Sequence, residues 1–164
     1  MRIVLGMGNL FKIKGVCRMK QYFFEDINIG KSESLSRHVS ATLVKAFAEV
    51  SGDNNPLHLN FEYAAASRFG EPIAQGVLLS SFISVVLGTQ MPGLGTIYVS
   101  QSITFKAPVK FGDTVVTTVT AASKDTNKNW VTFITNCFVG DKKVAAGEAI
   151  VYVPSRPNGQ KQPE

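Results

Sequence analysis

The chain has 164 residues, of which 45% are hydrophobic and 18% are charged. This composition is typical of one globular domain with a buried core, and it excludes a disordered protein. The two cysteines are too few for a disulfide framework, and the sequence has no CxxC pair or histidine cluster. We therefore expect a reducing compartment and no metal site.

Positive charge is concentrated at the N-terminus. Residues 1–20 contain five basic residues and no acidic residue, whereas 12 basic and 12 acidic residues cancel from Gln21 onward. A neutral domain gives no electrostatic reason to expect a nucleic-acid partner. We interpret residues 1–20 as a disordered basic leader or upstream extension. We favour an extension that ends before Met19 over a transit peptide, because the segment is poor in serine.

The expected location is the cytoplasm, with the mitochondrial matrix as the alternative if the basic segment is a transit peptide. No uninterrupted apolar run approaches the roughly 20 residues of a membrane span. We therefore expect no membrane partner.

Short elements are predicted in the first part of the domain, which we place at residues 21–154. Ser40 is a good N-cap, and the apolar residues that follow it recur with helical spacing. In chain order, the expected elements are an initial segment over 22–30 with a turn at Gly30, a strand over 34–39, a helix over 41–50 and a short helix over 61–68.

The stretch Ser51–His58 separates these two helices and brings together a carboxylate and an imidazole. Its glycine, its three residues of the Asp/Asn type and its proline all favour turns, so we expect no regular secondary structure here. A rigid polar turn between buried elements suits an acid–base pair, and Asp53 and His58 are the candidates. Each also has a structural interpretation, the aspartate as a turn cap and the histidine as a satisfied, half-buried side chain.

The most apolar segment covers residues 73–87. A helix here would be hydrophobic on nearly every side, which is typical of a buried helix, and it is too short to cross a bilayer. Only a few polar or small residues interrupt it: Gln75, Gly76, Ser80, Ser81 and Ser84.

Four strands are predicted after this helix, over 96–105, 114–121, 130–139 and 143–153, with turn residues between them. Consecutive strands suggest an antiparallel meander. A sheet has to cover its apolar face, and the helix over 73–87 is the only element apolar enough to do so. The expected fold class is therefore α+β, with a sheet wrapped around one central buried helix. Residues 155–164 are polar and are predicted to be a disordered tail.

Several motifs now allow a comparison with a known family. They are Tyr22–Asp26, Phe47–His58, Pro72–Gly76, Pro92–Gly93, Ser102–Val109 and Gly112–Asp113. Together they resemble the MaoC-type (R)-specific enoyl-CoA hydratases over roughly residues 22–153. The resemblance implies the hot-dog fold, in which a curved antiparallel sheet surrounds a central helix.

The resemblance also implies a reaction. In this family, water adds to a trans-2-enoyl thioester to give an (R)-3-hydroxyacyl thioester, or leaves in the reverse dehydration, in fatty acid or polyhydroxyalkanoate metabolism. The catalytic pair of the family corresponds to Asp53 and His58, and the backbone N–H that polarises the thioester carbonyl corresponds to Gly76. Residues expected to contact the substrate are Ser84, Leu87, Asn55 and Ile150.

The resemblance further implies a homodimer or larger homo-oligomer. No cofactor is expected beyond coenzyme A or acyl carrier protein, which enter as part of the thioester substrate. Many family members carry histidine where this chain has Gln75. Because the neighbouring glycine acts through its backbone, we expect the donor to the carbonyl to be kept.

Two other functions are compatible with the same fold. In a thioesterase, water would attack the carbonyl carbon, and in an acyl-CoA-binding module no reaction would follow binding. We favour the hydratase because the Asp–His spacing suits hydration, and because a binding module has no use for an acid–base pair.

Overall fold

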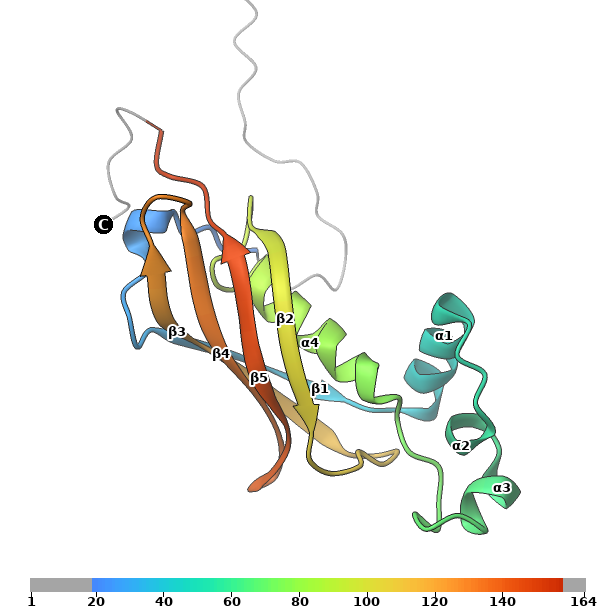
Figure 1. Cartoon of the computed structure of the whole chain (residues 1–164). Coiled ribbons are helices and arrows are strands. Elements are labelled where there is room, and N and C mark those ends of the chain that lie inside the picture. The colour runs from blue at the N-terminus through green and yellow to red at the C-terminus, as the bar shows by residue number, and fades with distance from the viewer. Residues whose placement is uncertain (1–18, 158–164) are drawn as a thin grey trace, which may run out of the picture.

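The computed structural model describes residues 19–157 and has the predicted α+β architecture (Figure 1). A curved antiparallel sheet of five strands lies along the helix α4, and three short helices project from one end of the sheet. The elements are a 3₁₀ helix Phe24–Asp26, β1 Ser32–His38, α1 Ala41–Ser51, α2 Pro56–Leu59, α3 Phe61–Ala65, α4 Gly76–Thr89, β2 Ile97–Phe105, β3 Thr114–Asp125, β4 Trp130–Val139 and β5 Lys142–Tyr152.

The strand order corrects the predicted meander. The order is β1-β3-β4-β5-β2, so only β3, β4 and β5 follow one another as neighbours. β2 pairs with the last strand, β5, and β1 pairs with the free side of β3. The segment 106–113 connects β2 to β3 across the two strands that lie between them in the sheet. Strand sequences alone do not say which edges meet.

Helix α4 contributes more buried residues to the core than any other helix or strand among residues 19–157. Its inward face packs on the alternate residues of β3, β4 and β5 that point toward it, as the predicted central helix should. Cys137 on β4 is fully buried among them, and burial raises the pKa of its thiol. The buried residues of α4 are Leu78, Leu79, Phe82, Ile83, Val86 and Leu87.

The central helix begins three residues later than its apolar pattern suggests. Ile73 forms an isolated β-bridge with Lys110, and the N–H of Ala74 donates to the Val109 carbonyl at 2.8 Å. Residues 73–75 are therefore extended, and α4 starts at Gly76. Apolar residues alone do not separate a buried helix from the buried extended segment that leads into it.

The stretch 51–58 is more regular than predicted. Ser40 caps α1 as expected, since its Oγ accepts a hydrogen bond from the Leu43 N–H at 3.1 Å, and the helix ends at Gly52 in the left-handed conformation. Residues 56–58 are not irregular but belong to the short helix α2. Proline is favoured at the first position of a helix, and Asn55 caps this one through its side-chain oxygen.

Contacts of the domain reach slightly beyond the predicted limits of 21–154. The Lys20 N–H donates to the Thr89 carbonyl at 2.8 Å, and Arg156 forms an ion pair with Asp26 at 2.5 Å. The rest of the predicted leader, 1–18, and of the predicted tail, 158–164, lies outside the described residues. Within residues 19–157, none of the helices is both long and apolar enough to cross a membrane.

The contact between β5 and the edge strand β2 leads to a test of the fold. A Cβ added to Gly147 would lie 1.9 Å from the Ser102 carbonyl oxygen, so Gly147→Ala has to push the two strands apart. We expect it to lower the free energy of unfolding by about 2 kcal/mol or more, as measured by urea denaturation. In contrast, Gly88→Ala in α4 meets nothing within 4 Å and should be neutral or stabilising by up to about 1 kcal/mol. Equal stabilities for the two variants would contradict this account of the β2–β5 contact.

Candidate active site

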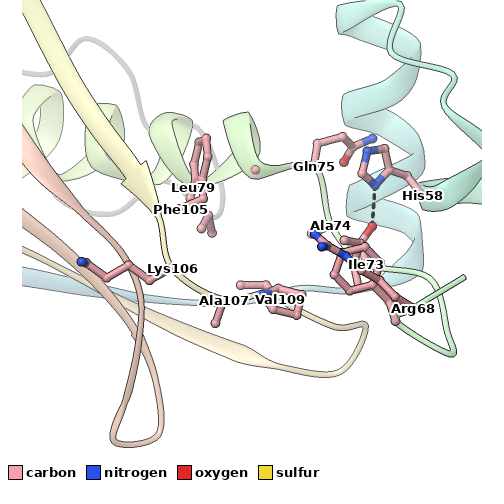
Figure 2. A pocket seen from close by; sticks show the side chains of 13 residues that line it. His58, Arg68, Ile73, Ala74, Gln75, Leu79, Phe105, Lys106, Ala107 and Val109 are labelled. Atoms are coloured by element: carbon pink, nitrogen blue, oxygen red, sulfur yellow. Dashed lines mark hydrogen bonds between the residues drawn. The ribbon is translucent and has the colours of Figure 1, made fainter.

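A cavity of about 280 Å³ lies at the start of α4, between α2, the loop after α3 and the end of β2. Most of its lining is apolar, and Figure 2 shows these side chains converging from several elements. The polar or charged side chains in its wall are those of His58, Arg68, Gln75 and Lys106. A mainly apolar pocket with a few converging polar groups is the usual form of a small-molecule site.

His58 projects from α2 into this cavity and is only 8% exposed. Its Nδ1 lies 2.7 Å from the Ile73 carbonyl oxygen, the hydrogen bond drawn in Figure 2. Because a carbonyl oxygen can only accept, Nδ1 carries the proton of the neutral ring. The other nitrogen, Nε2, therefore offers a lone pair, and the ring is held in one orientation.

Asp53 lies next to Nε2 of His58. Its Oδ2 is 3.9 Å from that nitrogen, which is too long for a direct hydrogen bond but short enough for one water molecule to contact both atoms. The other carboxylate oxygen, Oδ1, accepts a hydrogen bond from the Asn55 N–H at 3.3 Å. The Asp53 side chain is 44% exposed. The pair therefore consists of a buried imidazole and a carboxylate that is open to solvent.

Gly76 is the first residue of α4 and also lines the cavity. The first N–H groups of a helix lack acceptors within the helix and carry the positive end of its dipole. The preceding Gln75 makes no side-chain capping bond. A Cβ at Gly76 would lie 3.2 Å from the Phe105 ring. Glycine therefore allows the ring and the start of the helix to approach closely.

The four residues expected to contact substrate are not part of the cavity wall. Leu87 is fully buried in the core, and Ser84 is exposed on the outward side of α4. Asn55 caps α2 through its side-chain oxygen. Ile150 is half-buried on β5 between Ala149 and Val151, which are buried in the core, so it lies on the opposite face of the sheet. Of the predicted site residues, His58 and Gly76 line the cavity. Asp53 is outside its wall but lies beside the His58 ring, and Asn55 contacts the Asp53 carboxylate through its backbone N–H.

Sequence reasoning gave no site role to several residues of the cavity wall. Phe105 falls within a recognised motif, yet its residue type gave no sign that it lies against Gly76 and the cavity. Arg68, at the end of the predicted second helix, gave no signal either. Among residues 19–157, no group of three or more His, Cys, Asp or Glu side chains has the arrangement of a metal site.

Comparison with known proteins places the chain in a family. The model of the MaoC like domain matches residues 27–140. The (R)-specific enoyl-CoA hydratase of Rhodospirillum rubrum is 50% identical over 82% of this chain and 94% of its own length. The 3-hydroxybutyryl-CoA dehydratase of Methylorubrum extorquens is 41% identical over 84% of this chain and 88% of its own.

A solved structure extends the agreement to three dimensions. The (R)-hydratase from A. caviae involved in PHA biosynthesis superposes with a TM-score of 0.77 at 40% identity, covering 79% of this chain and 99% of that one. The predicted hot-dog fold is thereby confirmed. The family model spans most of the domain, and the R. rubrum relative is 50% identical over nearly all of its own length. The chain therefore belongs to the MaoC-like domain family.

Proposed function

We propose that this protein adds water to trans-2-enoyl thioesters to give (R)-3-hydroxyacyl thioesters, and catalyses the reverse dehydration. The strongest support is the position of His58 in the cavity wall, with the Asp53 carboxylate beside its ring. His58 Nε2, which offers a lone pair, lies 3.9 Å from Asp53 Oδ2. The N-terminus of α4 at Gly76 borders the same cavity as the imidazole. Relatives named as hydratases and dehydratases agree with this chemistry.

In the proposed reaction, the thioester carbonyl accepts a hydrogen bond from the Gly76 N–H. A water molecule between Asp53 and His58 loses a proton to the pair, and its oxygen bonds to C3 of the substrate. The electrons of the double bond move toward the carbonyl oxygen, where the helix N-terminus stabilises the negative charge. The pair then returns a proton to C2, so that one H and one OH are added overall.

The substrate supplies its own carrier in this proposal, and no further cofactor takes part. Coenzyme A and acyl carrier protein both present a pantetheine arm attached to phosphate. Arg68 and Lys106 give the cavity wall positive charge, which would attract this phosphate.

We propose the cytoplasm as the compartment in which the protein acts.

An assay with crotonyl-CoA, a four-carbon trans-2-enoyl thioester, tests the proposal. The wild-type protein should remove the near-ultraviolet absorbance of the conjugated thioester without releasing thiol. Asp53→Asn and His58→Gln should each lower kcat by ~10²–10⁴-fold, because each removes one partner of the proton transfer.

The matched control is Glu49→Gln, which makes the same carboxylate-to-amide change as Asp53→Asn at an exposed position of α1 and should keep full activity. Thiol release by the wild-type protein would indicate a thioesterase instead, and no change in either signal would indicate a binding module. Full activity in Asp53→Asn would contradict the assigned roles.

We also propose that two copies of the chain pair along β2. Among residues 19–157, this strand pairs only with β5, so its other edge is open. The strand carries exposed apolar side chains, among them Ile97, Val99 and Phe105. An open apolar edge normally needs a cover. Phe105 also borders the cavity, so a second copy on this edge would lie beside the site.

Val99→Lys should weaken this association. The new ammonium group would lie at the paired edge and come close to its copy in the second chain, and charged side chains on an edge strand disfavour edge-to-edge pairing. Sedimentation velocity should show dimers for the wild-type protein and mainly monomers for the variant. Val50→Lys, at a position of α1 that is 88% exposed, should stay dimeric. A wild-type protein that remains monomeric at high concentration would refute pairing along β2.

A further inference from the structure

Gln75 is a buried polar residue whose part in the site is not explained by the proposed chemistry. It is only 1% exposed, directly precedes Gly76 and borders the cavity that contains His58. Figure 2 shows its amide on the same side of the cavity as the His58 imidazole. The side chain does not cap α4, so it has no role in starting the helix.

The two ends of the Gln75 amide differ in their contacts. Nε2 donates to the Val44 carbonyl of α1 at 3.3 Å. Oε1 is buried and has no hydrogen-bond partner among residues 19–157. An unpartnered buried acceptor costs free energy that an apolar side chain of similar size would avoid. Packing alone therefore does not account for glutamine at this position.

The residues around Gln75 suggest what its amide contributes. The segment 73–76 contributes to two parts of the proposed site: the Ile73 carbonyl orients His58, and Gly76 starts α4. Gln75 adds the bond to α1, the helix whose C-terminal end leads through Gly52 to Asp53. Without this bond, the element that carries the carboxylate would lose a direct tie to the segment that carries the N–H donor.

We propose that Gln75 is a positioning residue, which holds α1, and with it Asp53, in register with His58 and the Gly76 N–H. The inference rests on the proposed hydratase function and adds a residue that does not itself react. Reacting groups have to be held within a fraction of an ångström, and displacements of about 1 Å can cost on the order of 10²-fold in rate.

Three variants test this role by comparing activity with stability. Gln75→Leu removes both ends of the amide, and we expect an unchanged or higher melting temperature, because the unpartnered Oε1 is lost. We expect kcat for crotonyl-CoA hydration to fall at least about tenfold with little change in KM. Gln75→His keeps an N–H able to reach the Val44 carbonyl and should restore most of the activity. Gln75→Met, which is unbranched, replaces the leucine variant if that variant does not fold.

The matched control is Thr117→Val. This residue is also buried and polar, and its hydroxyl contacts Cys137 in the core, away from the cavity. Its loss should leave kcat unchanged. An unchanged kcat in Gln75→Leu, or a fall no larger than the loss of folded protein, would overturn the positioning role.

Nitrogen NMR of the two histidines provides a readout that does not depend on activity. His38 is exposed on β1 and serves as an internal reference. In Gln75→Leu we expect the His58 ring signals to move and those of His38 to stay. If the wild-type protein does not hydrate enoyl thioesters, the proposed function fails, and the His58 signals still decide whether Gln75 keeps α1 and Asp53 in register with the imidazole. Unchanged His58 signals would refute the inference.

Discussion

The hydrogen bond between His58 Nδ1 and the Ile73 carbonyl is the interaction on which the site depends. It connects α2, one of the projecting helices in Figure 1, to the extended segment that leads into the central helix α4. It also selects the tautomer of the ring, because a carbonyl accepts and never donates. This one hydrogen bond therefore fixes the position of Nε2 and leaves a lone pair on it.

The core explains why this arrangement can be rigid. Helix α4 is buried along one face by the curved sheet, and close packing leaves it little freedom to shift. Its first turn emerges at the end of the sheet, where the cavity begins. A helix N-terminus aimed at a carbonyl oxygen is useful only if it does not move as charge develops. The apolar core thus provides the fixed frame for a backbone donor, while the projecting helices bring the groups that exchange protons.

Much of the local structure followed from sequence patterns. Ser40 marked the start of α1, the apolar run identified the central helix, and the Asp53–His58 spacing identified the pair that the structure places 3.9 Å apart. The pairing of β2 with β5 did not follow, nor did the extended backbone of residues 73–75 or the short helix at Pro56. The strand pairing and the extended backbone depend on partners that are distant in the chain. The short helix is a choice between a turn and a helix, for which the local preferences are similar.

The sequence by itself determined which chemical groups are available. A carboxylate, an imidazole and a glycine ahead of an apolar helix are recognisable because their types and spacing are local properties. Only the tertiary structure decided which lone pair faces the carboxylate, and that Gln75 lies buried between α1 and α4. Tautomers and buried hydrogen bonds depend on acceptors that folding brings together, such as the carbonyls of Ile73 and Val44. Residues distant in sequence supply these acceptors, so local sequence patterns do not predict them.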